Sequence, residues 1–148
     1  MKRASALQPL SHDHHQALFV AQKLRRATEE TAIEARDQLL AYWHNHGAQH
    51  FRREEEELLP AYAGHGDPGH PLVVQVLVDH VEIRRRARDL EQDGAPSVKT
   101  LRKLGVRLSD HVRLEERELF PLIEETVPVA ELELLAARLA SVESARET

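Results

Sequence analysis

The sequence predicts an all-α protein, an antiparallel up-down four-helix bundle with a short extra C-terminal helix. Every long segment repeats its apolar side chains with a period near 3.6, and none alternates with a period of two. Leu, Ala, Glu and Arg dominate and only 4% of residues are aromatic, which favours helices. Short connections between long helices favour an antiparallel bundle. We expect residues 1–148 to form a single domain.

Polar and breaking residues place the first two helices. Pro9 can open a first helix over about 9–27, because proline is tolerated in the first helical turn. The polar segment "ATEET" then separates it from a second helix over about 32–59. The segment "GHGDPGHP" at 64–71 is the strongest loop signal in the chain, because glycine and proline interrupt regular structure.

The remaining helices are placed in the same way. Pro71 suits the first helical position of a third helix that extends to about residue 91. The loop "QDGAPS" precedes a fourth helix over about 97–120, which we expect Pro121 to interrupt. Pro128 opens the short fifth helix, "VAELELLAARLASVE".

Each of the four principal helices carries one apolar stripe that a histidine interrupts. On the second and fourth helices a glutamate follows four residues later, one turn along the same face. A buried, unpaired charge is costly, so six such residues need a common explanation, and a metal ion supplies one. The predicted metal ligands are His14, His50, Glu54, His80, His111 and Glu115.

The apolar members of these stripes follow from the same periodicity. The expected inward residues include Ile33, Leu40 and Trp43 on the second helix, Leu72 on the third and Leu122 on the fourth.

An internal repeat relates the two halves of the chain. The windows "HFRREEEELLP" (50–60) and "HVRLEERELFP" (111–121) match at seven of eleven positions. A second pair, "DHH" at 13–15 and "DHV" at 79–81, precedes them. The repeat predicts an approximate two-fold relation with two equivalent half-sites facing each other. Among the recurring glutamates, we expect Glu55 and Glu57 to lie on the outer face and pair with arginines.

Four imidazoles and two carboxylates define the chemistry of the predicted site. Imidazole suits iron, zinc, copper and nickel, whereas carboxylate favours harder ions. Such mixed sets resemble those of di-iron bundles, in which carboxylates bridge two metals, and Glu54 and Glu115 are placed to be the bridges. Six protein ligands leave coordination positions open, which favours a reactive or ligand-binding centre over a closed structural one. Metal affinity should fall in acid.

The order of these residues resembles the hemerythrin-like family, also called the HHE cation-binding domain. His14, "HFRRE" at 50–54, His80 and "HVRLE" at 111–115 carry the resemblance, which covers residues 5–145. It implies a four-helix bundle that holds two iron ions in a carboxylate-bridged and oxo- or hydroxo-bridged centre. Family members bind or reduce dioxygen, respond to nitric oxide or peroxide, sense iron or help to repair damaged iron centres.

The sequence departs from the oxygen-carrying members of that family. Val76 stands where those members have a second histidine on the third helix, one turn before His80. They also have an aspartate five residues after the last histidine, whereas this chain has Glu115 at four and Glu116 at five. The pattern is closer to members linked to nitrosative stress and iron-centre repair. Those often carry an extra cysteine-bearing N-terminal domain, which we expect this chain not to have.

Two ligand assignments have alternatives. The stripe phase and the match of "DH" at 13–14 with "DH" at 79–80 favour His14, and His15 is the alternative. His46 lies one turn before His50 and is an extra candidate, although the matching position in the other half of the repeat is Arg107. We interpret His46 as a structural residue or a neighbour of the ligands. We expect His44, His65 and His70 to be surface or loop residues, and assign packing roles to Tyr42, Trp43 and Tyr62.

Composition excludes several classes of function. Cysteine is absent, so a disulfide, a thiolate metal site and a cysteine nucleophile are excluded. A net charge of −5 gives no general attraction to nucleic acid or to an anionic membrane. No apolar segment approaches the roughly 18 residues that span a bilayer. Residues 1–15 contain no continuous apolar core, so we do not expect them to be a secretory signal. We therefore expect a cytoplasmic protein, a monomer or a weak homodimer.

The leading hypothesis is a di-iron protein that binds dioxygen, nitric oxide or peroxide, in the response to oxidative or nitrosative stress or in iron homeostasis. We expect a binding protein for metal and diatomic ligands rather than a dedicated enzyme. One alternative is an iron-sensing or regulatory bundle whose fifth helix, with its Leu132–Leu139 stripe, forms the partner surface. The others are the same site filled by zinc or manganese, and a purely structural bundle.

Overall fold

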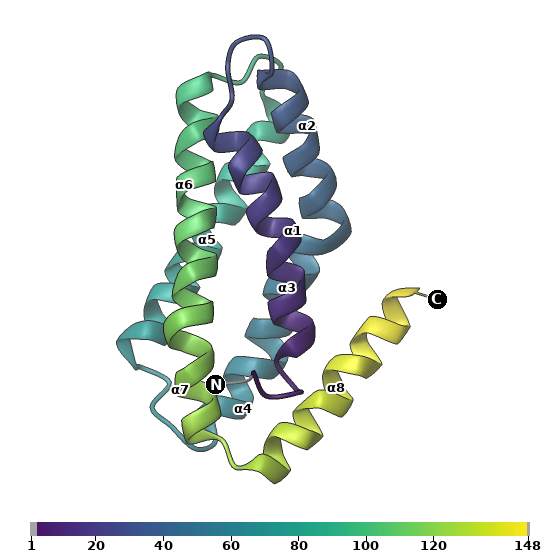
Figure 1. Ribbon diagram of the computed structural model, residues 1–148, viewed down its shortest axis with the longest axis vertical. Coiled ribbons are helices and arrows are strands. Elements are labelled where there is room, and N and C mark those ends of the chain that lie inside the picture. The colour runs from purple at the N-terminus through teal and green to yellow at the C-terminus, as the bar shows by residue number, and fades with distance from the viewer. Residues whose placement is uncertain (1–2, 148) are drawn as a thin grey trace.

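The protein is an all-helical bundle in the computed structural model, which describes residues 3–147 and their side chains to residue 140. Long helical segments lie side by side, and a further helix leaves the bundle at its lower end (Figure 1). Every element among the described residues is helical, so the all-α prediction is confirmed. Residues 1, 2 and 148 of the expected domain lie outside the described residues.

The first half of the chain forms a helix and a longer, segmented helical stretch. α1 spans Gln8–Arg25. The second stretch was expected to end at residue 59, but it continues four residues further, past Pro60. Its consecutive segments are α2 (Ala32–Tyr42), the π-helical segment η1 (Trp43–Gly47), α3 (Ala48–Arg53), the π-helical segment η2 (Glu54–Leu58) and α4 (Leu59–Ala63).

The second half repeats this plan. α5 (Pro71–Gln92) begins at its proline, and the His70 ring accepts a hydrogen bond from the Leu72 backbone N–H at 3.1 Å. Ser97 caps the next helix by accepting from the Thr100 N–H at 3.0 Å. The elements that follow are α6 (Val98–Leu114), η3 (Glu115–Leu119), α7 (Phe120–Thr126) and α8 (Val129–Glu147), of which α8 is longer than the expected short helix.

Two of the π-helical segments end two residues before a proline, η2 before Pro60 and η3 before Pro121. The Leu59 N–H donates to the Glu54 carbonyl and the Phe120 N–H to the Glu115 carbonyl, five residues back instead of four. Proline has no N–H, and in an α-helix its ring clashes with the carbonyl four residues earlier. One wider turn relieves this conflict. Pro121 therefore does not interrupt the helix, contrary to the prediction.

The π-helical segments also correct the expected apolar stripes. Each wider turn holds an extra residue, and one residue corresponds to a rotation of about 100°. Before η1 the buried residues are therefore Leu39 and its neighbours one turn away, while Ile33 is 57% exposed. After η3, Ile123 is buried in place of Leu122. A separate correction concerns the start of α5, which is a continuous α-helix. There Leu72 is half-buried at the edge of the stripe, and Val73 occupies the core.

Two apolar clusters fill the bundle and leave a polar layer between them. Along α1, Leu10 belongs to one cluster and Ala17 to the other. Along α5, Val76 and Ile83 are divided in the same way. The histidine of each helix lies between these pairs, so the predicted ligands occupy a layer with packed apolar residues above and below it.

Close packing of α1 against α6 depends on a glycine. A Cβ atom at Gly105 would lie 2.8 Å from the Ala21 carbonyl oxygen and 2.8 Å from the Arg25 backbone nitrogen. The glycine thus lets two of the ligand-bearing helices approach each other.

α8 packs through Leu132, Leu135 and Leu139 on the apolar cluster that contains Leu10. The Leu132–Leu139 stripe is therefore buried in the bundle and does not form the partner surface expected from the sequence. On the same helix, Arg138 Nε lies 3.9 Å from Glu57 Oε2. Within the described part of the chain, no helix combines the length and hydrophobicity that a membrane span requires.

Candidate metal centre

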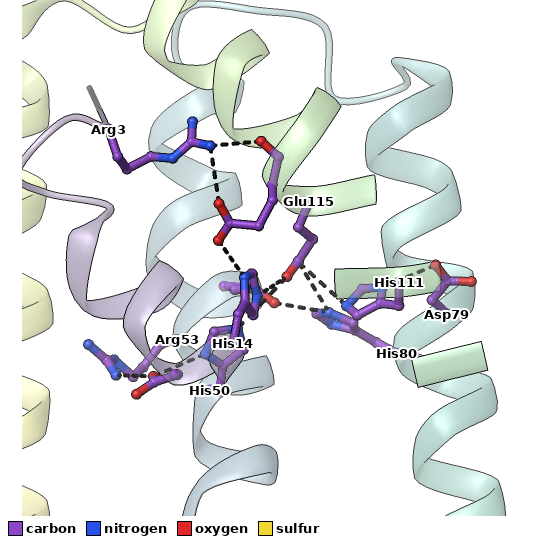
Figure 2. A network of polar contacts seen from close by, with 11 residues as sticks. Arg3, His14, His50, Arg53, Asp79, His80, His111 and Glu115 are labelled. Carbon is purple, nitrogen blue, oxygen red and sulfur yellow. Dashed lines mark hydrogen bonds and ion pairs between the residues drawn. The ribbon is translucent and has the colours of Figure 1, made fainter. Parts of the chain in front are cut away.

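The six predicted ligands lie together in the interior of the bundle. Each is at most 4% exposed, and both glutamates are completely buried. The histidines approach from α1, α3, α5 and α6 and turn toward Glu115 (Figure 2). The two glutamates are the first residues of η2 and η3. The structure therefore brings the whole predicted set into one polar layer.

The inward atoms are the Nε2 nitrogens of the histidines and the carboxylate oxygens. His14 Nε2 is 2.8 Å from Glu115 Oε1, and His80 Nε2 is 3.1 Å from Glu54 Oε1. The other two close pairs are His50 Nε2 with Glu54 Oε2 at 3.4 Å and His111 Nε2 with Glu115 Oε2 at 3.5 Å.

These atoms form two groups of four, in each of which all ligand atoms lie within 4.8 Å of one another. One group contains His14 and His50, and the other contains His80 and His111. Glu54 and Glu115 belong to both groups. This is the division into half-sites that the sequence repeat predicts, with the two carboxylates lying between them.

Several of the inward atoms have no hydrogen-bond partner among the described residues. They are Nε2 of His50, His80 and His111, both oxygens of Glu54, and Oε2 of Glu115. Leaving buried polar atoms unpaired costs about 1–3 kcal/mol each, and native proteins rarely accumulate them in one place. Cations held in the two groups would satisfy these atoms, and imidazole with carboxylate suits iron, zinc and manganese. The residues present therefore fit a metal ion.

The opposite ring nitrogen of every inward histidine contacts a second carboxylate. An ionised carboxylate only accepts hydrogen bonds, so each Nδ1–H donates and each Nε2 atom faces the centre. We call these four acids the outer carboxylates. The pairs are His14 with Glu116 (2.7 Å), His50 with Asp13 (3.1 Å), His80 with Glu55 (2.6 Å) and His111 with Asp79 (3.0 Å).

An arginine lies behind each outer carboxylate. The contacts are Arg3 with Glu116 (3.1 Å), Arg53 with Asp13 (3.4 Å), Arg84 with Glu55 (2.6 Å) and Arg107 with Asp79 (3.0 Å). Arg3 and Arg53 lie at the outside of the cluster in Figure 2. Four arginine–carboxylate–histidine series thus converge on the buried layer from different sides.

The arginines help to keep the outer carboxylates ionised. Burial raises the pKa of Glu116, but its hydrogen bond from His14 and the charge of Arg3 outweigh burial and hold the pKa at about 2. Burial likewise opposes the shift at Asp79, where the contacts of His111 and Arg107 lower the pKa. The acids therefore act as fixed hydrogen-bond acceptors for the histidine rings.

The outer carboxylates were not predicted from the sequence. Glu55 was expected only to pair with arginine on the outer face; it does pair with Arg84, but it also binds His80. Its repeat counterpart Glu116 binds His14 in the equivalent way. Glu55 and Glu116 occupy the same position in the two repeat windows, and this match was the sequence signal for their shared role.

The alternative ligands lie outside the cluster. His15 is exposed, and its ring is 5.8 Å from that of His12. His46 is half-buried and lines a surface groove with Tyr42. Among the described residues, the groups that could hold a metal include neither. His44 is exposed and pairs with Glu91, His65 is exposed and His70 caps α5, in agreement with the prediction.

Three inward histidines have raised pKa values in the metal-free protein. Burial lowers the pKa of His14, but its hydrogen bonds to Glu115 and Glu116 outweigh burial and raise the pKa to about 9. Burial also opposes the shifts of the other two, where neighbouring carboxylates raise the pKa of His80 to about 9 and that of His50 well above its ordinary value. Without metal, protonated histidines are held next to the buried carboxylates by their opposite charges and hydrogen bonds.

We expect the metal-free protein to lose stability between pH 6.5 and pH 9. The folded protein retains protons on His14 and His80 up to about pH 9, whereas the unfolded chain releases them near 6.5. This stabilisation is therefore complete below pH 6.5 and lost as the pH rises through 9. Chelator-treated protein should show a Tm at least roughly 5 °C lower at the upper end of this range. Glu116→Gln, which removes the negative charge beside His14, should reduce the decrease; a constant or rising Tm in the parent protein would contradict this explanation.

The chain matches the model of one protein family, described as the hemerythrin HHE cation binding domain, over residues 7–123. The matched range contains all six inward residues and the four outer carboxylates, and it ends within α7. No curated protein and no solved structure matches the chain. The family description and the buried cluster both indicate metal binding.

Proposed function

Because the chain belongs to the hemerythrin HHE cation-binding family, we propose that it holds two iron ions and binds dioxygen, nitric oxide or peroxide there. The observation that carries the proposal is the pair of glutamates shared between two groups of histidines. A single ion within one group would leave the two imidazoles of the other group without a cation. Two ions, each held by the two histidines of one group together with Glu54 and Glu115, would use all six side chains.

The ligand set supports iron and an open coordination position. Two imidazoles and two shared carboxylate oxygens give each ion four protein atoms, fewer than the six that iron commonly takes. Val76, one turn before His80, is completely buried and offers no ligand atom. Small molecules could therefore bind the iron ion near Val76. Bound iron would supply one-electron redox chemistry toward such a ligand.

The surrounding side chains would orient the ligands and exclude water. The Phe51 ring stacks on His80 with centroids 3.8 Å apart, and Phe120 lies parallel to His14 at 5.5 Å. The outer carboxylates fix the ring tautomers, so that Nε2 is available to metal at each histidine. This buried, preorganised layer favours binding of a small uncharged ligand.

Metal analysis is the test of this function. Protein produced in iron-supplemented medium should contain about two irons per chain, one for each histidine pair. Near-ultraviolet bands should shift with azide, and stopped-flow mixing of the reduced protein with dioxygen, nitric oxide and peroxide should rank the ligands. Zinc or manganese in the same positions would support the alternative occupant. A metal-free protein with unchanged Tm after metal addition would contradict metal binding.

Iron sensing without turnover is the second candidate, because the exposed side of α8 carries Leu134 (57% exposed) next to Glu133. Loading with iron should then change partner binding while reaction with peroxide stays slow. A monomeric or weakly dimeric, cytoplasmic protein is part of the proposal for either function.

A further inference from the structure

A groove lies between α5 and α6, outside the metal centre. It has a cavity volume of about 750 Å³. Two valines form its apolar part, and one acid, Asp110, is among its lining residues. Its cationic lining residues are Arg86, Lys99, Arg102, Lys103 and Arg107. A chain with a net charge of −5 therefore presents a concentrated positive surface here.

The groove is elongated along α6. Its lining residues on that helix run from Val98 to Asp110, a rise of about 18 Å. The cations recur one helical turn apart, at Lys99, Lys103 and Arg107, with Val106 (47% exposed) between them. An amphipathic helix with carboxylates at one-turn spacing would face these cations, and its apolar residues would cover the valine.

Other polyanions match the groove less well. Aromatic side chains, on which unpaired bases stack, are missing from its lining residues. A long nucleic acid or an anionic bilayer would also meet the negative charge of the rest of the protein. A short acidic helix contacts the groove alone and avoids this repulsion.

Arg107 links the groove to the metal centre. Its Nη2 lies 3.0 Å from Asp79 Oδ1, and Asp79 Oδ2 accepts from His111 Nδ1 at 3.0 Å. A smaller groove of about 280 Å³, lined by Asp79 and Leu114 among others, adjoins the larger one at Arg107 and Asp110. A carboxylate that docks on Arg107 therefore adds negative charge beside a histidine of the cluster.

We propose that the α5–α6 groove docks an acidic amphipathic helix of a partner protein, and that Arg107 couples docking to metal binding. The coupling rests on the proposed metal function, whereas docking does not. Negative charge near His111 favours a bound cation, so docking should strengthen metal binding, and bound metal should strengthen docking by the same factor.

Docking is tested on the metal-free protein with a defined probe. The probe is a labelled peptide of about 16 residues, helical, with leucines on one face and glutamates beside them. Fluorescence anisotropy should show binding that weakens with salt. The double variant Lys99→Glu/Lys103→Glu should weaken binding at least about tenfold. Lys23→Glu/Arg88→Glu makes the same change of charge at exposed positions outside the groove and should leave binding within about twofold.

Two results would overturn docking. One is an equal loss of peptide binding in the two double variants. The other is tighter binding of a single-stranded oligonucleotide or of anionic vesicles than of the acidic peptide.

Coupling is tested with Zn²⁺ as a redox-inactive probe metal. Zinc loading should tighten peptide binding roughly fivefold in the parent protein. Arg107→Gln should abolish that factor, whereas Arg84→Gln should keep it, because Arg84 ends the equivalent series at His80 away from the groove. The same factor in both variants would overturn the role of Arg107. Failure of zinc to bind would contradict the proposed metal function while the peptide result stands.

Discussion

Glu54→Gln should release metal from both histidine groups at once. Glu54 is completely buried, belongs to both groups, and neither of its oxygens has a hydrogen-bond partner among the described residues. The amide keeps the size of the side chain but removes the charge and one acceptor oxygen. We expect the affinity for iron or zinc to fall at least about 100-fold, more than loss of an outer partner costs. Metal content after gel filtration and a zinc competition titration measure the effect.

Glu57→Gln is the matched control, from the same run of four glutamates. Glu57 also recurs in the repeat, but its described contact is Arg138 of α8 at 3.9 Å, away from the centre. Its replacement should leave metal content unchanged. The helical circular dichroism signal of both variants should match that of the parent. Equal metal loss from both variants, or full occupancy in Glu54→Gln, would remove Glu54 from the ligand set.

His111→Ala should lower the metal content from about two ions per chain to about one. Its Nε2 belongs only to the group that also contains His80, so the group of His14 and His50 keeps both imidazoles. The truncation also leaves Asp79 with Arg107 and Gln75 as partners, so the helix should remain folded. Metal analysis and absorption spectroscopy should show the partial loss.

A neighbouring pair of histidines provides the control for this prediction. His14→Ala should reduce metal content as His111→Ala does, because it removes an imidazole from the other group. His15→Ala should have no effect, because His15 is exposed and lies outside both groups. Metal loss from His15→Ala with retention in His14→Ala would reverse the assignment of the α1 ligand. Full occupancy in His111→Ala would contradict the two-group site.

The sequence identified the inward residues because their spacing is a local property. Residues four apart on an α-helix share a face, so His50 and Glu54 point the same way wherever the helix packs. The apolar stripe on either side then shows which face is buried. The same reasoning selected Glu54 from four consecutive glutamates, and the repeat supported it with Glu115. The structure places both glutamates at 0% exposure.

The predicted buried positions are wrong where the helix departs from α geometry. Ile33 and Leu122 were placed by counting with a period of 3.6 across segments that the structure shows as π-helical. Each wider turn shifts the phase by one residue, so a stripe counted from the histidine is wrong on the far side of the wider turn. Pro60 and Pro121 indicated two of these segments, since a helix that continues through a proline needs such an adjustment. No proline follows η1, and the available signal there was Gly47. A Cβ atom at this position would lie 2.8 Å from the rings of Tyr42 and Trp43.

By itself, then, the sequence determined the helical fold class, the two-fold repeat and the six inward residues, because all of these follow from periodicity along one helix. Only the tertiary structure decided which acid supports which histidine. His14 meets Glu116 across 102 residues of sequence, and His111 meets Asp79 across 32. Such contacts depend on how deeply and at what angle separate helices pack, which no spacing within one helix specifies. The arginines behind the acids, and the link from Arg107 to the α5–α6 groove, arise from the same packing.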